Sequence, residues 1–148
     1  FAVEALEAMA AAIGAGRVGF RICPGNPFND IHDEDPAETY GALLDAAGGL
    51  DLAYLHLIDV PNPQVNSLAL AKSHWSGPLI LNESMTRERA EGLLRDGVAD
   101  AFSFGRPFIG NPDLVARMEA GAPLADFDPA TLYMGGSQGY VDYAPLSS

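Results

Sequence analysis

The segment Phe102-Ser-Phe-Gly-Arg-Pro-Phe-Ile109, followed by Asn111-Pro-Asp-Leu114, predicts a short apolar strand that runs through a Gly-Arg turn into a helix. Gly105 would let the backbone approach a bound group closely, and Arg106 adds a permanent cation with a planar set of donors. The Asn-Pro pair of the second stretch has the residue types of a helix N-cap and first helical position. Backbone N–H groups at a helix start favour anions, so the segment predicts a phosphate site.

The rest of the chain alternates between segments with helical spacing and short apolar segments with strand patterns. Helices are expected over residues 2–15, 36–48, 66–75 and 86–96, and strands over 18–22, 52–59, 78–82 and 101–104. This order is typical of βα units in a parallel sheet, either an open doubly wound sheet or part of a (β/α)8 barrel. No Gly-x-Gly-x-x-Gly follows a strand. Polar residues instead stand at each strand's carboxyl end, where barrel enzymes build their sites; they are Arg21, Asp59, Asn82 and Gly105-Arg106.

Composition excludes several classes of protein. The chain has 148 residues, of which 48% are apolar, enough for one ordinary domain with a core. Twenty acidic and eight basic side chains give a net charge of -12, which opposes binding to nucleic acid or to anionic membranes. No apolar run reaches the roughly 18 residues of a membrane helix. A single cysteine, Cys23, fits a reducing cytosol, so we expect a cytoplasmic protein.

The beginning of the chain suggests a processed chain or a fragment. The sequence starts at Phe1, without Met and already inside an amphipathic pattern, and no basic region of a signal peptide precedes it. Metal and hydrolase sites are not expected either. The three histidines lack metal-ligand spacing, and Ser84 and Ser103 have no recognisable His and Asp partners. Tyr54 and His56 share one strand face, where we expect a structural hydrogen bond rather than catalysis.

Several short motifs occur in an order that resembles the C-terminal half of an old yellow enzyme. They are Arg21-Ile-Cys-Pro24, Asp35-Pro36 with Thr39-Tyr40, Tyr54-Leu-His56, Phe104-Gly-Arg-Pro-Phe-Ile-Gly-Asn-Pro-Asp-Leu114, Gly121-Ala-Pro-Leu124, and Tyr133-Met-Gly-Gly136 with Gly139-Tyr-Val-Asp-Tyr143. Members of this family are FMN-dependent, NAD(P)H-using ene-reductases on a (β/α)8 barrel. The resemblance implies that residues 1–148 form a single half-barrel unit with strands five to eight.

The resemblance also implies a set of cofactor-binding residues. Arg21 matches the strand-five arginine beside the pyrimidine edge of the flavin, although an arginine paired with a carboxylate is the alternative. Gly105 and Arg106 match the pair that binds the FMN phosphate, with backbone donors from Asn82, Glu83 and Ser84. Glu83 departs from the pattern, because many relatives carry glycine there. Either this carboxylate turns to solvent or it lowers the affinity for phosphate.

Two aromatic residues would lie on the substrate side of the flavin. Tyr133 matches a C-terminal tyrosine that lines the substrate site, and we expect it to bind substrate rather than to act as an acid. Phe28 resembles an aromatic residue near the flavin or substrate, but an aromatic that only packs within its loop is the alternative. The family's substrate-carbonyl pair and proton-donating tyrosine lie on the first half of the barrel. No catalytic residue is therefore assigned in this chain.

The function expected from the resemblance is the reduction of an activated C=C bond. NAD(P)H would deliver hydride to FMN, and flavin N5 would pass it to the β-carbon of an enone-like substrate. A half-barrel exposes two sheet edges and an inner face, so we expect a second polypeptide that carries strands one to four, or alternatively a homodimer. Two other hypotheses remain: a non-catalytic FMN-binding scaffold and another phosphate-binding barrel enzyme.

Overall fold

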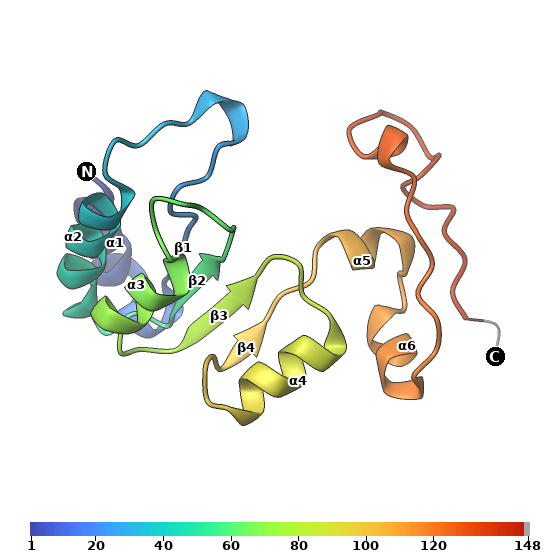
Figure 1. Ribbon diagram of the computed structural model, residues 1–148. Coiled ribbons are helices and arrows are strands. Elements are labelled where there is room, and N and C mark those ends of the chain that lie inside the picture. Colours follow the sequence, from blue (N-terminus) through green and yellow to red (C-terminus); the bar gives the residue numbers. More distant parts are fainter. Residues whose placement is uncertain (147–148) are drawn as a thin grey trace. The chain divides into compact units, whose positions relative to one another are not determined.

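A computed structural model describes residues 1–146, and the chain divides into two compact units that meet between Ser103 and Phe104. The first unit contains a parallel sheet with the strand order β1-β2-β3-β4 (Figure 1). Its strands are β1 (Gly19–Ile22), β2 (Tyr54–Ile58), β3 (Leu79–Asn82) and β4 (Ala101–Phe102). The predicted α/β class and the four parallel strands are confirmed. The prediction of a single half-barrel unit stays a prediction.

Helices alternate with these strands as predicted. The first unit has α1 (Ala2–Ile13), α2 (Pro36–Gly48), α3 (Ser67–His74) and α4 (Arg87–Arg95), with short 3-10 turns η1 (Ala15–Arg17) and η2 (Phe28–Asp30). Helix α2 contacts both α1 and α3, and α3 contacts β2 (Figure 1). The predicted cap of α2 is present, because the Asp35 carboxylate accepts a hydrogen bond of 2.9 Å from the Glu38 N–H, with Pro36 at the first helical position.

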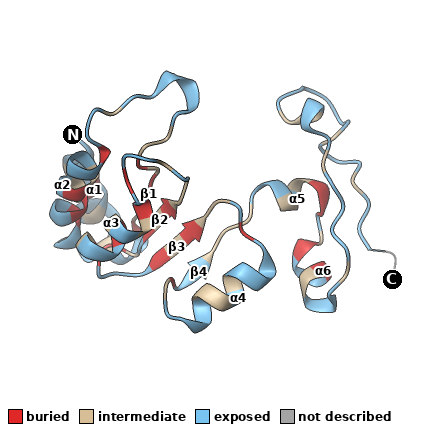
Figure 2. Ribbon diagram, in the orientation of Figure 1, coloured by how far each residue is buried: buried red, intermediate tan, exposed pale blue. Residues whose placement is uncertain are grey.

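The two faces of the sheet have different environments. Alternate side chains of a strand point to opposite faces, and one set in this sheet is buried together with residues of α2 (Figure 2). The buried strand residues are Ile22, Leu55, Leu57, Leu79 and Leu81, and the buried residues of α2 include Leu44 and Ala47. Full burial of one large apolar side chain contributes about 1.5–3 kcal/mol, so this layer supplies the core. The alternate set, which includes Arg21 and His56, is exposed or half-buried.

The second unit contains α5 (Arg106–Gly110), α6 (Leu114–Ala120) and η3 (Pro129–Thr131). The predicted N-cap at Asn111 is wrong, because α6 begins at Leu114 with Asp113 before it. The Asn111 side chain is fully buried. Its amide nitrogen donates to the carbonyl oxygens of Pro107 (2.8 Å) and Ala125 (2.9 Å), and its oxygen accepts from the Ala125 N–H (2.8 Å). These three bonds satisfy backbone groups of two segments that lie 18 positions apart in the sequence, whereas a cap would have satisfied one group of the adjacent turn.

A buried arginine ties the end of the described chain to α6. Arg117 is 7% exposed and donates to the Asp113 carboxylate (2.7 Å) and to the carbonyl oxygens of Pro123 (3.0 Å) and Ala144 (3.0 Å). The hydrogen bond from Arg117, followed by one from the Leu146 N–H, holds the pKa of Asp113 below its ordinary value. The carboxylate therefore stays charged and paired at neutral pH.

None of the helices in the described residues is long and apolar enough to cross a bilayer.

The substitution Asn111→Ala should lower the free energy of unfolding of the second unit by about 2–3 kcal/mol, because it leaves the backbone groups of Pro107 and Ala125 without partners. Urea unfolding, followed by hydrogen exchange of amides 107–125, measures this loss. Gln138→Ala, at an exposed position of the same unit, is the control and should change stability by less than about 0.5 kcal/mol. Equal stability of the two variants would contradict the assigned role of Asn111.

Candidate functional site

A chain of hydrogen bonds links strand ends on the open face of the sheet. The Arg21 guanidinium donates from Nη2 to the Asn82 side-chain oxygen at 3.1 Å. The Asn82 amide nitrogen in turn donates to the Ser103 carbonyl oxygen at 2.9 Å. Residues of β1 and β3 are thereby connected to the residue that follows β4. In the described part of the chain Arg21 pairs with an amide and an imidazole, and the choice between a flavin contact and a carboxylate partner stays a prediction.

His56 lies beside this chain on β2. Its Nε2 is 2.8 Å from the Ser103 hydroxyl oxygen, which is the structural hydrogen bond expected from the sequence. Both ring nitrogens are 3.4 Å from Arg21 Nη1, a weak contact. Burial, and secondly the Arg21 cation, lowers the pKa of His56 below its ordinary value of 6.5. The imidazole is therefore neutral at pH 7, and Arg21 is the cation of this cluster.

The titration of His56 provides a test of this arrangement. We expect its NMR titration midpoint to lie below 6.5 and to rise in Arg21→Gln without reaching 6.5, because burial remains after the cation is removed. The contribution of His56 to stability should be complete above pH 6.5 and lost as the pH falls from 6.5 through the folded-state pKa, since only the unfolded chain protonates readily there. A midpoint at or above 6.5 in the unsubstituted protein would be inconsistent with the geometry.

The turn after β3 has an unusual backbone. Glu83 has φ of 91° and Ser84 has φ of 47°, a region that favours glycine over other residues. This explains why glycine suits the position, as expected from the resemblance. Residue Glu83 is half-buried, and its carboxylate accepts a hydrogen bond of 3.3 Å from the hydroxyl of the neighbouring Ser84. Its effect on phosphate affinity stays a prediction.

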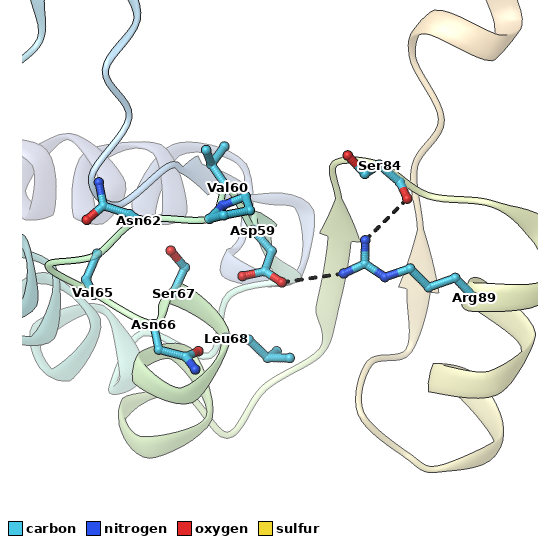
Figure 3. Close-up of a pocket in the computed structure, with 10 residues that line it drawn as sticks. Asp59, Val60, Asn62, Val65, Asn66, Ser67, Leu68, Ser84 and Arg89 are labelled. Carbon is cyan, nitrogen blue, oxygen red and sulfur yellow. Dashed lines mark hydrogen bonds and ion pairs between the residues drawn. The ribbon is translucent and has the colours of Figure 1, made fainter.

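Arg89 of α4 binds this turn from one side (Figure 3). Its Nη1 donates to the carbonyl oxygens of Glu83 (3.1 Å) and Ser84 (3.3 Å), and its Nη2 is 3.7 Å from the Asp59 carboxylate. The position of Asp59 at the end of a predicted strand indicated this residue, whereas Arg89 was not predicted. The available signal was weak: a basic residue three positions after the Thr86 cap usually indicates a solvated helix face.

A pocket of about 410 Å³ adjoins Arg89 and Asp59 (Figure 3). Its other polar side chains mostly bind the chain itself. Asn62 donates to the Gly25 carbonyl oxygen at 2.6 Å, and the Asn66 side chain accepts the Ala69 N–H at 2.9 Å as the cap of α3. These groups stabilise the surrounding loops, so the pocket gives no indication of a ligand class. The described residues contain no group of three or more His, Cys, Asp or Glu that could hold a metal.

The remaining predicted site residues are exposed. Gly105 immediately precedes α5, and a Cβ added there would meet nothing within 4 Å, so space for a ligand exists beside it. Arg106, the first residue of α5, is exposed, as is Phe28 in η2. Tyr133 is 99% exposed. The structure brings Arg21 and Asn82 together, with Glu83 and Ser84 next in the chain. The grouping of these residues with Gly105, Arg106 and Tyr133 of the second unit stays a prediction.

Residues 1–125 match the model of the NADH:flavin oxidoreductase / NADH oxidase family. The chain belongs to this family. A probable flavin mononucleotide-dependent alkene reductase of Leishmania infantum is 41% identical over 145 residues, which cover 97% of this chain and 40% of the relative. A putative 12-oxophytodienoate reductase 3 of Oryza sativa subsp. japonica is 33% identical, with the same two coverages. The resemblance to old yellow enzymes and the expectation of FMN as the family's cofactor are confirmed.

Solved structures of the family are also similar. The old yellow enzyme from Trypanosoma cruzi aligns with a TM-score of 0.88 and 34% identity, covering 96% of this chain and 38% of that one. Morphinone reductase in complex with tetrahydroNAD aligns with a TM-score of 0.86 and 35% identity, covering 99% and 40%. The chain therefore spans about two fifths of the length of these relatives.

Proposed function

We propose that the chain is the FMN-binding half of an ene-reductase and that β1 to β4 correspond to strands five to eight of its (β/α)8 barrel. The observation that carries the proposal is the Arg21–Asn82 hydrogen bond of 3.1 Å at the carboxyl ends of the parallel strands. Sites of barrel enzymes lie at this end of the sheet. The order of the sequence motifs supports the assignment to the second half.

The residues at this face suit the pyrimidine edge of a flavin. That edge presents a ring nitrogen and carbonyl oxygens, which are hydrogen-bond acceptors, and Arg21 carries five N–H donors in a planar fork. Asn82 fixes the direction of this fork, and the neutral His56 adds no second cation. A fixed guanidinium would stabilise negative charge that develops on the edge of a reduced ring.

The phosphate of FMN would be held elsewhere. Gly105 leaves open space beside the backbone, and Arg106 supplies a cation that matches phosphate geometry. Backbone N–H groups of the Asn82-Glu83-Ser84 turn would complete the set. Tyr133 and Phe28, both exposed aromatic residues, are the proposed substrate contacts.

Bound FMN would supply hydride transfer from NAD(P)H to an activated C=C bond. The residues of this chain would bind and orient the flavin, while the groups that bind the substrate carbonyl and donate a proton would come from the other half of the barrel. If the purified protein binds FMN but oxidises no NAD(P)H with cyclohexenone, the alternative of a non-catalytic FMN-binding scaffold holds instead.

Removal of the Arg106 cation should weaken FMN binding. In the purified protein, with any co-purified polypeptide, Arg106→Ala should raise the Kd for FMN by about ten- to a hundredfold, as expected for the loss of a charge-assisted hydrogen bond. Lys72→Ala, which removes one positive charge from an exposed position, is the control and should leave the Kd for FMN unchanged. Flavin fluorescence quenching measures both. An unaltered FMN affinity in Arg106→Ala, or no FMN binding by the unsubstituted protein, would refute the proposal.

The proposed partner is a second polypeptide that carries strands one to four. Its support is physical: β1 and β4 are the end strands of the open sheet, and the face with Arg21 and His56 is not covered within the first unit. A homodimer of two half-barrels is the alternative. A polypeptide with strands one to four would pair with both exposed sheet edges. It would also supply the groups that bind the substrate carbonyl and donate a proton, so we favour it over the homodimer.

Molar mass in solution distinguishes these arrangements. We expect light scattering to give a mass above the 15.6 kDa of this chain, together with a second polypeptide on a denaturing gel. Twice the chain mass with one band would support the homodimer. A stable, well-folded monomer of 15.6 kDa would contradict both.

A further inference from the structure

We propose that Arg89 is a positioning residue that holds the Glu83–Ser84 turn in the shape that presents backbone donors to an anion. The inference rests on the proposed FMN function, because it assigns the residue that shapes the phosphate-binding turn. Arg89 binds the carbonyl oxygens of Glu83 and Ser84, and Figure 3 shows the bond to Ser84. Its role would therefore be exerted through the backbone.

The direction of the donors follows from peptide geometry. The described chain has no cis peptide bonds, and in a planar trans peptide the C=O and the following N–H point in opposite directions. Arg89 Nη1 binds the Glu83 and Ser84 carbonyl oxygens at 3.1 and 3.3 Å. The N–H groups of Ser84 and Met85 belong to the same two peptides, so they point away from the guanidinium. Two adjacent N–H groups with this orientation are the elements of an anion-binding turn.

The turn needs external support because of its residue types. Glycine adopts positive φ at no steric cost, but Glu83 and Ser84 carry a Cβ and adopt φ of 91° and 47°. Such conformations persist where the surroundings fix them. Two hydrogen bonds from one guanidinium nitrogen to consecutive carbonyl oxygens fix both peptides at once.

Arg89 is itself anchored to the sheet. Its Nη2 is 3.7 Å from the Asp59 carboxylate, and the Asp59 N–H donates to the Asn82 carbonyl oxygen at 3.2 Å. Asp59 directly follows β2, and Asn82 ends β3. The guanidinium therefore spans the ends of two adjacent strands and the turn that follows the second of them.

The first experiment compares Arg89→Ala and Arg89→Lys with Arg95→Ala, an exposed change in the last turn of the same helix. In Arg89→Ala, hydrogen exchange of the Ser84 and Met85 amides should accelerate, and the Kd for FMN should rise about tenfold. Arg89→Lys keeps the charge but not the planar fork, so its values should lie between those of Arg89→Ala and the unsubstituted protein. Arg95→Ala should change neither quantity.

A second experiment separates a backbone role from a charge effect. Glu83→Gly relieves the positive φ and removes the carboxylate, whereas Glu83→Gln removes only the charge. Arg89→Ala should therefore raise the FMN Kd less than threefold in the Glu83→Gly background and about tenfold in the Glu83→Gln background. Equal losses in both backgrounds would show that Arg89 acts through its charge and would overturn the proposal.

The two measurements also separate this inference from the proposed function. Hydrogen exchange requires no flavin. If exchange is faster in Arg89→Ala but the unsubstituted protein binds no FMN, the result supports the role of Arg89 in holding the turn and rejects the flavin assignment. If the unsubstituted protein binds FMN and Arg89→Ala changes neither the hydrogen exchange nor the Kd, the flavin assignment is kept and the proposed role of Arg89 is overturned.

Discussion

The Arg21–Asn82–Ser103 hydrogen-bond chain is the interaction on which the open face of the sheet depends. Parallel strands bring their carboxyl ends to one edge, where polar side chains must pair with each other or with water. Asn82 accepts from Arg21 and donates to the Ser103 carbonyl oxygen, so one amide links the ends of three strands. His56 completes the set without adding charge, because burial keeps it neutral. The result is a single cation held in a fixed direction.

The conformation of the turn that follows Asn82 depends on a balance between backbone strain and hydrogen bonds from a neighbouring helix. A residue other than glycine held in a sparsely populated backbone region costs on the order of 1–3 kcal/mol, and Glu83 and Ser84 both have positive φ. Two hydrogen bonds from Arg89, at 3.1 and 3.3 Å, oppose that cost. The conformation that glycine adopts through its own freedom is reached here through a contact from the next helix. The turn and α4 are consequently coupled, and a change in one alters the other.

Much of the fold could be predicted because it depends on local patterns. Short apolar segments predicted all four strands, and the Asp35-Pro36 pair predicted the start of α2. Asn111 was misassigned because a capping asparagine and a buried one have the same residue type, and its partner Ala125 is 14 positions away. The site was only partly predictable for the same reason. Strand position indicated Arg21 and Asn82, but no local pattern indicates the contacts of Arg89 with the preceding turn.

The charge on the open face constrains what can cover it. The opposite face carries buried leucines, whereas this face presents Arg21, whose hydrogen bonds go to the neutral Asn82 and His56. A partner that closed over it with apolar side chains alone would bury a guanidinium without a counter-charge, at a cost of several kcal/mol. Closure is therefore favourable only together with an acceptor that takes up the donors of Arg21. A partner that covers this face must therefore meet Arg21 with hydrogen-bond acceptors or a negative charge, supplied by its own residues or by a bound ligand.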